Sequence, residues 1–434
     1  MLRSLLRKLN GSRSSEISKN PLEPLSRPVI TTQGSWTALQ TSSLLPQTST
    51  SVPKIGLVYC FFESTLQFNG NTGVQRVARQ TARAIAKAGI RVIATTWDAE
   101  KRSLAPLLPK EIDHLAKWSG PSPEQWHPWV PPSEAPENSW FMSNEMPPKL
   151  GPGVNDHVIE LVKLNGLKTA VTFFDAIPVI FPHLYPAGSA ELHYSYMEQL
   201  AKWDLILPIS MQSAKDMFDL LPESISTDLD INRKLIPLPL PCEFTSAKQN
   251  ADPPVSINAR PFILMISTFE QRKNHISHLR AMAIAQRSLP FGFDLILVGH
   301  PLEASVVRLV NLYKEILPSM KVVHDASDNQ IKEWLARADF TIFPSVEEGF
   351  GLPIVESLWH GKPVICDNQR AINEIAKDGG CLQVDVLNVE QLTEAIVTLA
   401  TNFHVYRSKC KEIENRSFST WDNYASTIVS LMSL

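Results

Sequence analysis

The sequence predicts an α/β protein with two domains, each built around a parallel sheet covered by helices. Its 434 residues exceed one typical domain, since domains usually span about 100 to 200 residues. Short apolar runs of strand length alternate with amphipathic helical segments in both halves of the chain. Repeated prolines at residues 236–241 and 252–254 separate the two sets. Two similar α/β domains joined by such a hinge suggest a ligand held in a central cleft.

The expected boundaries follow from changes in composition along the chain. Residues 10–53 are rich in Ser, Thr, Pro, Gln and Asn, too polar to offset the entropy lost on ordering. We therefore expect a disordered arm (1–53), a first Rossmann-like domain (54–240), a linker (241–258), a second Rossmann-like domain (259–419) and a terminal helix (420–434) that crosses back onto the first domain.

The first domain begins with an apolar run of buried-strand length, residues 54–62. A helix follows, with a capping box predicted at Thr72 and Gln75 and an end at Gly89, and the next strand is residues 91–96. Further strands are expected at 169–174 and 205–209. The aromatic residues between Trp118 and Trp140 are expected to pack a long loop onto its own domain, although rings there could also stack on a sugar.

The second domain shows the same alternation, with a helix expected to start at a capping box of Ser327 and Gln330. Its expected strands are residues 261–266, 294–298, 321–324, 340–343 and 363–366.

Charge and cysteine content exclude several functions. There are 41 basic and 44 acidic side chains, a net charge of −3, which argues against nucleic-acid binding. The five cysteines are scattered without a Cys-x-x-Cys pair, as expected of a protein in the reducing cytoplasm. No apolar run is long enough to span a bilayer. Leucines spaced helically among basic residues at positions 2–9 could touch a membrane surface weakly, but a frayed tail is the favoured interpretation.

The most informative stretch is residues 343–356, FPSVEEGFGLPIVE. A strand ends, two glycines form a tight loop, and Pro353 stands where a helix would take its first residue. Free amides and the positive end of the helix dipole make such a loop an anion site. Glu348 and Glu356 lie either side of it, and carboxylates accept hydrogen bonds from sugar hydroxyls. The loop therefore predicts a diphosphate with a sugar on each side, rather than a bare turn with two exposed acids.

Arg272 and Lys273 follow the first strand of the second domain. At the carboxyl edge of an open sheet, they could neutralise the charge of a departing diphosphate. Taken alone, these cations would equally suit a solvated loop.

These two stretches together resemble the retaining GT-B glycosyltransferases of the large group 1 family, which includes bacterial mannosyl- and rhamnosyltransferases. The resemblance covers most of the chain from about residue 54. It extends to Gly73-Val74-Gln75-Arg76, to the loop of residues 174–178 with Phe181-Pro182, and to Ser210.

The resemblance implies a role for each matching residue. Arg272, Lys273, Glu348 and Asp175 would be catalytic, with Arg272 and Lys273 on the diphosphate and Glu348 on the transferred sugar. Gly73 and Arg76 would lie on the acceptor side. The remaining donor-binding residues would be Glu356 on the ribose, with Ser267, Gly349, Phe350, Gly351 and Leu352.

The chain departs from the family at two places. Phe174 stands where the family often has His, and Pro241-Cys242-Glu243 replaces a frequent Gly-Val-Asp. Phenylalanine cannot donate a hydrogen bond to the sugar, so either Asp175 and backbone groups suffice or the pocket is inactive. We favour activity.

The sequence contains little that would indicate a metal or redox cofactor. Asp228-Leu229-Asp230 resembles a metal motif of another glycosyltransferase fold, but its polar setting favours a solvent loop. There is no His-x-x-x-His pair for zinc and no Gly-x-Gly-x-x-Gly for a dinucleotide. No metal or other cofactor is therefore expected, and the nucleotide sugar is a co-substrate.

The predicted function is transfer of a hexose, first mannose from GDP-mannose, to a glycan or lipid-linked glycan in polysaccharide synthesis, with retention. The expected location is the cytoplasm, or the inner face of the membrane. A non-catalytic scaffold or sugar-binding protein is the main alternative, and a glycosyl phosphorylase ranks last.

Overall fold

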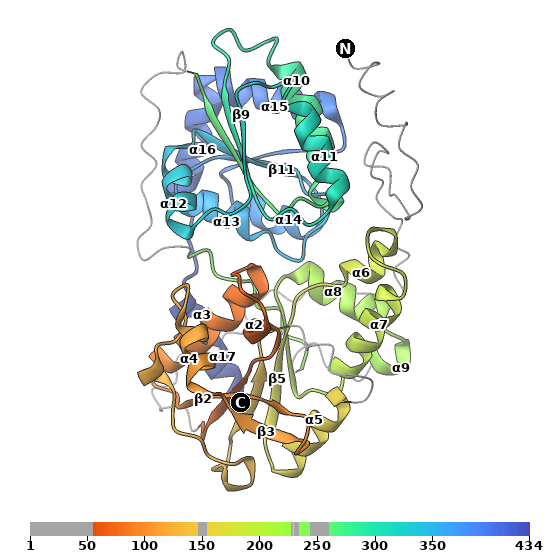
Figure 1. Ribbon diagram of the computed structural model, residues 1–434, viewed down its shortest axis with the longest axis vertical. Helices are drawn as coiled ribbons and strands as arrows, with labels where there is room; N and C mark the ends of the chain where they lie inside the picture. Colours follow the sequence, from red (N-terminus) through yellow and green to blue (C-terminus); the bar gives the residue numbers. More distant parts are fainter. Residues whose placement is uncertain (1–54, 146–153, 227–228, 230–233, 244–259) are drawn as a thin grey trace. The chain divides into compact units, whose positions relative to one another are not determined.

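The computed structural model describes residues 55–145, 154–226, 229, 234–243 and 260–434 (Figure 1). Several sequence predictions lie outside these residues: the arm of residues 1–53 with its basic amphipathic start, most of the linker 241–258, and both aspartates of the Asp228–Asp230 motif.

The described chain folds into two compact units. The amino-terminal unit contains the described residues up to Glu243 together with Phe418–Leu434, and the carboxyl-terminal unit contains residues 260–417. Each unit has a six-stranded sheet with helices on both faces (Figure 1). The α/β class predicted from the sequence is therefore confirmed.

The sheet of the amino-terminal unit has the order β3-β2-β1-β4-β5-β6. All neighbouring pairs are parallel except β2 with β3, which is antiparallel. The first strand, β1, lies in the middle of this sheet, and the strand order reverses between β1 and β4. The strands are β1 (Val58–Phe61), β2 (Val92–Asp98), β3 (Ser103–Pro106), β4 (Trp140–Ser143), β5 (Lys168–Phe173) and β6 (Leu205–Pro208).

The sheet of the carboxyl-terminal unit has the order β12-β11-β10-β7-β8-β9, and every neighbouring pair is parallel. Here the order reverses between β7 and β10. The strands are β7 (Phe262–Ile266), β8 (Asp294–Val298), β9 (Met320–Val323), β10 (Phe340–Phe343), β11 (Val364–Asp367) and β12 (Cys381–Val384).

Helix α3 of the amino-terminal unit begins after Thr72, as predicted, but not through a capping box. The Thr72 hydroxyl contacts the side chain of Gln75 and makes no cap bond to the backbone. Helix α17 packs against α3, and Lys87 pairs with Asp422 between them at 2.5 Å. The helices are α2 (Ser64–Gln67), α3 (Gly73–Lys87), α4 (Pro109–Ala116), α5 (Val154–Leu164), α6 (Ile177–Ile180), α7 (Ser189–Leu200), α8 (Met211–Leu220), α9 (Glu223–Ser226) and α17 (Trp421–Met432).

In the carboxyl-terminal unit the capping box predicted at Ser327 and Gln330 is confirmed at the start of α12. The helices are α10 (His275–Ala285), α11 (Ala304–Tyr313), α12 (Asp328–Arg337), α13 (Leu352–Trp359), α14 (Arg370–Ala376), α15 (Val389–Thr401) and α16 (Phe403–Glu414).

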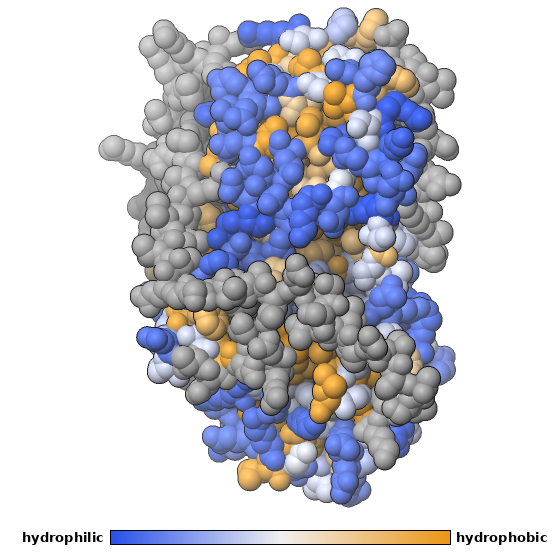
Figure 2. Space-filling model, turned by 180° about the vertical axis from the view of Figure 1, so that it is seen from behind, coloured by the Kyte–Doolittle hydropathy of each residue, from blue (hydrophilic) through white to orange (hydrophobic). Residues whose placement is uncertain are grey.

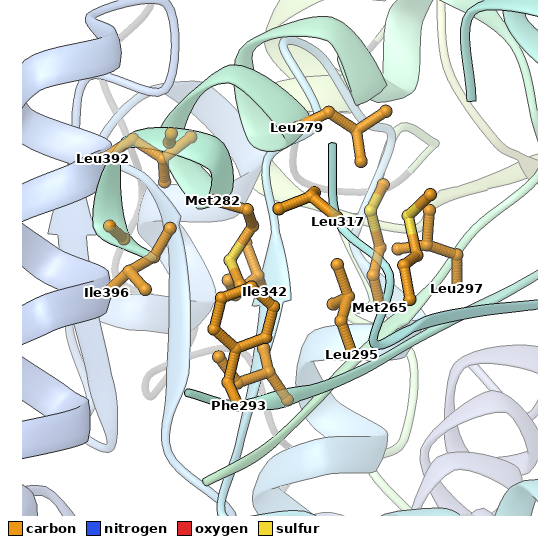
Figure 3. Close-up of a cluster of buried hydrophobic side chains, with 14 of the residues drawn as sticks. Met265, Leu279, Met282, Phe293, Leu295, Leu297, Leu317, Ile342, Leu392 and Ile396 are labelled. Atoms are coloured by element: carbon orange, nitrogen blue, oxygen red, sulfur yellow. The ribbon is translucent and has the colours of Figure 1, made fainter. Parts of the chain in front are cut away.

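The core of the carboxyl-terminal unit explains why the strands of this unit are continuous apolar runs in the sequence. On β7, Met265 faces the cluster formed with α10, α11 and α15 (Figure 3). Leu264 faces the cluster formed with α12. Successive side chains on a strand point to opposite faces, and both faces are buried here. Full burial of one such side chain stabilises the fold by about 1.5–3 kcal/mol.

Three short strands were not predicted: β3, β4 and β12. Trp140, taken as the end of a loop, begins β4, which pairs with β1. The tryptophans before it pack onto their own unit, as favoured: Trp126 meets Phe62 edge-on at 5.9 Å, and Trp129 meets Tyr59 at 6.2 Å.

The surface is mainly polar on the face shown in Figure 2, with smaller groups of hydrophobic residues among hydrophilic ones. None of the helices in the described part of the chain is both long and apolar enough to cross a bilayer. All five cysteines lie in described residues and are free thiols.

Candidate active site

The strand order of the carboxyl-terminal unit brings two distant loops together. β7 and β10 are adjacent parallel strands, so the loops after their carboxyl ends meet at one edge of the sheet. Because the strand order reverses between them, this edge is where open α/β sheets bind ligands. The loop after β7 carries Arg272 and Lys273, and the loop after β10 carries Glu348.

The loop after β7 holds its two cations on a short 3-10 turn, Gln271–Lys273. The turn ends at Asn274, whose left-handed backbone (φ 54°) redirects the chain into α10. Asparagine tolerates this conformation better than most residues. Its side chain accepts a hydrogen bond from the Ser277 amide at 3.4 Å and donates one to the Val386 carbonyl at 2.9 Å. These bonds fix the turn that presents Arg272 and Lys273.

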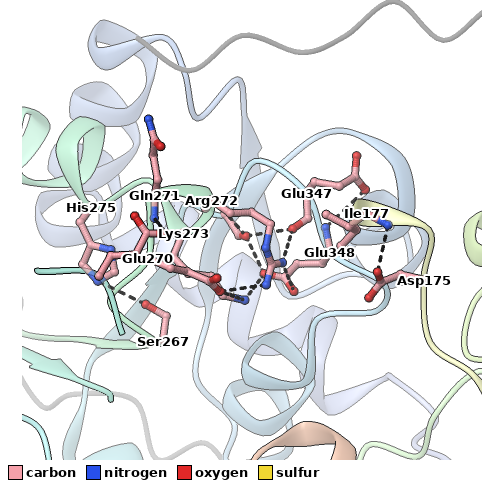
Figure 4. Close-up of polar contacts among 12 residues, drawn as sticks. Asp175, Ile177, Ser267, Glu270, Gln271, Arg272, Lys273, His275, Glu347 and Glu348 are labelled. Carbon is pink, nitrogen blue, oxygen red and sulfur yellow. Dashed lines mark hydrogen bonds and ion pairs between the residues drawn. The ribbon is translucent and has the colours of Figure 1, made fainter. Parts of the chain in front are cut away.

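Both cations are paired with carboxylates (Figure 4). Arg272 Nη1 lies 3.0 Å from Glu348 Oε2, and Lys273 Nζ lies 2.5 Å from Glu348 Oε1. On the other side, Arg272 Nη2 lies 2.9 Å from Glu270 Oε1. The side chains of Arg272, Lys273 and Glu348 are only 14%, 11% and 11% exposed, which excludes the solvated-loop alternative.

The surroundings of Glu348 keep it ionised. Burial by itself would raise the pKa of this carboxyl, but the charges of Arg272 and Lys273, with hydrogen bonds from Lys273 and Ser345, lower the pKa to about 2. Such a carboxylate neutralises the two cations and stays charged at any physiological pH. An anionic ligand that displaces Glu348 from them would free its oxygens for hydroxyl groups.

The glycine loop after β10 has the geometry of an anion site. Gly351, with φ 120°, precedes α13, and Leu352 is the first helical residue. Pro353 therefore occupies the second helical position, one later than predicted. Within the described part of the chain, the amides of Phe350, Gly351 and Leu352 donate no hydrogen bond. Three amides at a helix start can bind phosphate oxygens.

The other predicted donor residues lie near this edge. Glu356, in the second turn of α13, is 5% exposed, so it is not the exposed acid of a bare turn. Ser267 directly follows β7, and its hydroxyl lies 3.5 Å from Nε2 of buried His275. Burial, the neighbouring His278 and the charge of Lys273 lower the pKa of His275 to about 3, so its ring is neutral.

The structure adds four residues that the sequence reasoning missed: Glu270, Ser345, Glu347 and Arg370. Glu347 is buried, and its Oε2 lies 2.5 Å from Nε of Arg370. Its carbonyl accepts a hydrogen bond from Arg272 Nη1 at 2.7 Å. Glu270, Ser345 and Glu347 could have been found because they lie within three residues of Arg272 or Glu348 in the sequence. The sequence around Arg370 contains no motif that would have indicated a site residue.

The residues predicted for the acceptor side lie in the amino-terminal unit, at the carboxyl edge of its sheet. Gly73 begins α3, with Arg76 in the first turn. Asp175 follows β5, and its Oδ1 accepts a hydrogen bond from the Ile177 amide at 3.0 Å, which starts α6 (Figure 4). Phe174 is buried (7% exposed). The roles of these residues stay predictions.

A buried polar network lies beneath the loop after β1 in the same unit. Glu145, which follows β4, accepts hydrogen bonds from the amides of Glu63, Ser64 and Thr65 at 2.6–3.0 Å. Burial raises the pKa of Glu145 despite these bonds. Burial, with the nearby charge of Glu145, raises the pKa of Glu63 to about 7. Sequence reasoning did not find this network, because its members are some eighty residues apart.

Metal binding has no obvious location in the part of the chain that the structure describes. No group of three or more His, Cys, Asp or Glu side chains there is arranged to hold an ion.

The fold and this edge together define a class of protein. One of the two α/β units has paired cations, a carboxylate bound to both of them and free helix amides at its strand-order reversal. These groups suit a ligand that carries a diphosphate and a sugar.

The comparison with protein families agrees with this class. Residues 260–402 match the family described as "Glycosyl transferases group 1". Residues 260–402 are thus similar to this family, which confirms the resemblance drawn from the motifs at Arg272–Lys273 and Glu348–Glu356.

Relatives and solved structures extend the likeness beyond that segment. The O-antigen chain mannosyltransferase B of Escherichia coli is 27% identical over 238 residues, which cover 53% of this chain and 61% of the relative. A Campylobacter jejuni enzyme named N-acetylgalactosamine-N,N'-diacetylbacillosaminyl-diphospho-undecaprenol 4-alpha-N-acetylgalactosaminyltransferase is 28% identical over 155 residues, 35% of this chain and 41% of its own. The chain thus matches less than two thirds of the length of either relative.

Among solved structures, a sucrose-phosphate synthase from Thermosynechococcus elongatus aligns with a TM-score of 0.59 at 15% identity, covering 87% of this chain and 98% of that one. This likeness concerns the fold, which is the predicted GT-B fold with two α/β units.

Proposed function

We propose that the protein is a glycosyltransferase that moves a hexose from a nucleoside-diphosphate sugar to a glycan or lipid-linked glycan. The observation that carries this proposal is the largely buried cluster in which Arg272 and Lys273 both hold Glu348 beside the free amides of residues 350–352. A diphosphate offers the charge that these cations and amides bind, and a sugar offers hydroxyls for the carboxylate.

The chemistry follows from the charges. As the bond between sugar and diphosphate breaks, negative charge accumulates on the leaving diphosphate and the glycosyl centre becomes oxocarbenium-like. Arg272 and Lys273 lie in a site largely shielded from water, where their stabilisation of that charge exceeds what they would give in bulk solvent. Glu348, released from the cations, would accept hydrogen bonds from the sugar hydroxyls.

The finer assignments belong to the same proposal. Mannose from GDP-mannose is the first donor to test, supported by the mannosyltransferase among the relatives. An acceptor for polysaccharide synthesis is supported by the name of the Escherichia coli relative, and a lipid diphosphate as its carrier by the name of the Campylobacter jejuni relative. We further propose retention of the anomeric configuration. We also propose that transfer needs no divalent metal, because Arg272 and Lys273 supply the positive charge; full activity in EDTA is the corresponding expectation.

A ligand screen tests the donor. The protein is heated with GDP, UDP, dTDP and their sugars, and the nucleotide that binds the folded state raises the melting temperature. Transfer from the donor so identified is then followed by release of the free nucleoside diphosphate. No shift with any nucleotide, and no transfer, would contradict the proposal.

Lys273→Ala tests the role of the paired cations. Loss of one group that stabilises transition-state charge lowers turnover by about 10²- to 10³-fold. The matched control is Lys314→Ala, at an exposed lysine that follows α11 in the same unit. Unchanged turnover in Lys273→Ala would show that Lys273 does not stabilise the leaving diphosphate.

The alternative of a non-catalytic scaffold or sugar-binding protein is favoured by Phe174, a buried residue where the family often has His. Phe174→His separates the two. Wild-type protein that transfers sugar excludes the scaffold, whereas transfer that appears only in the variant identifies a degenerate enzyme.

A further inference from the structure

Arg370 combines a strained backbone with a buried ion pair. It is the first residue of α14, and its φ of 48° lies in the left-handed region. An arginine gains nothing from this conformation, whereas a glycine adopts it freely. A non-glycine residue stays in this conformation only where surrounding contacts hold it there.

That side chain reaches the loop after β10. Its Nε lies 2.5 Å from Oε2 of Glu347, whose carboxylate is only 2% exposed. The other oxygen of this carboxylate accepts a hydrogen bond from the amide of Glu348 at 3.3 Å. A buried carboxylate needs a charged partner, and Arg370 is such a partner for Glu347.

Glu347 is thus held from two sides. Arg370 holds the Glu347 carboxylate, while the Glu347 carbonyl accepts a hydrogen bond from Arg272 Nη1 at 2.7 Å and lies 3.2 Å from Ser345 Oγ. The same Ser345 hydroxyl donates to Glu348 Oε1 at 2.5 Å. The orientation of Glu348 therefore depends on a segment that Arg370 anchors from the start of α14, the helix that follows the neighbouring strand β11.

We propose that Arg370 is a positioning residue for the sugar end of the donor. Through Glu347 it holds the backbone of Glu348 so that this carboxylate can meet the transferred sugar. The inference rests on the proposed function, and it names a residue that neither the motif nor the family description contains. Because Arg370 acts on Glu348 through Glu347, at the sugar end of the site, its loss should affect transfer and not binding of the free nucleotide.

The key variant is the double replacement Arg370→Gly with Glu347→Gln. It removes both charges of the pair, so no buried carboxylate is left alone, and it lets the backbone relax. We expect a melting temperature close to that of the wild type, an unchanged Kd for the free nucleoside diphosphate, and kcat lowered by about 10- to 100-fold, as for a slightly misplaced reacting group.

Two further variants complete the test. Arg370→Lys keeps a cation for Glu347, so its kcat should lie between that of the double variant and that of the wild type. Arg102→Gly is the matched backbone control, because Arg102 is exposed and also has a positive φ, 50°, but lies in the other unit. It should leave kcat unchanged.

The outcomes separate the two proposals. A double variant with wild-type kcat, or one in which melting temperature, nucleotide affinity and kcat fall together, overturns the positioning role while leaving the glycosyltransferase assignment intact. A wild-type protein that binds no nucleotide and transfers no sugar overturns both.

Discussion

Replacing Glu348 with glutamine tests the electrostatics of the site most directly. Glutamine keeps the shape and one oxygen but removes the charge that neutralises Arg272 and Lys273. The pKa of Glu348 falls from 4.5 to about 2, a difference of about 2.5 units. At about 1.4 kcal/mol per unit, the ionised carboxylate contributes about 3 kcal/mol to the folded state.

The contribution has a defined pH dependence. Since the pKa is lower in the folded than in the unfolded state, the stabilisation is fully present above about pH 4.5 and is lost as the pH falls toward 2. At pH 7 the Glu348→Gln protein should therefore be less stable by about 3 kcal/mol, or roughly 6–12 °C in the melting of a domain this size. Near pH 2–3 the two proteins should approach equal stability.

Calorimetry and denaturant unfolding at pH 7, 5 and 3 measure this difference. The control is Glu333→Gln, which removes an exposed partner of Arg337 and should change stability little. A deficit that is absent at pH 7, or that stays the same at pH 3, would refute the reasoning.

A second measurement on the same variant concerns the ligand. Without Glu348, the two cations lack part of their compensation, so a diphosphate restores more stability than in the wild type. The melting-temperature rise caused by the nucleoside diphosphate should be larger in the variant, although sugar transfer falls. An equal or smaller rise would show that the diphosphate does not bind these cations.

Three other substitutions have defined outcomes. Glu356→Ala should weaken binding of the free nucleotide by roughly 10- to 100-fold, the value of a charged hydrogen bond to the ribose, and calorimetry that shows unchanged affinity would contradict this role. Gly351→Ala should cost about 1–3 kcal/mol, measured by urea unfolding, because φ is 120° and the added Cβ would lie 3.2 Å from Ile354 Cδ1. Asn274→Ala should cost about 1–2 kcal/mol through loss of the helix cap, and an unchanged unfolding midpoint would show that the turn forms without it.

The local elements could be predicted from the sequence because their causes are local. An apolar run such as Phe262–Ile266 is buried on both faces in any parallel sheet, and Ser327 with Gln330 caps a helix through neighbouring residues. The short strand β4 was missed because its aromatic start resembles the preceding loop, and it becomes a strand by pairing with β1. The capping box predicted at Thr72 does not form, because the Thr72 hydroxyl bonds to the Gln75 side chain and not to a backbone amide.

The candidate site divides in the same way. The sequence by itself determined the glycine turn before α13, the paired cations after β7 and the two glutamates around the turn, because each depends on adjacent residues. Only the tertiary structure decided which charges meet. Glu348 pairs with Lys273 and Glu347 with Arg370 because β7, β10 and β11 are neighbours in the sheet, an arrangement set by burial of both faces across the whole unit.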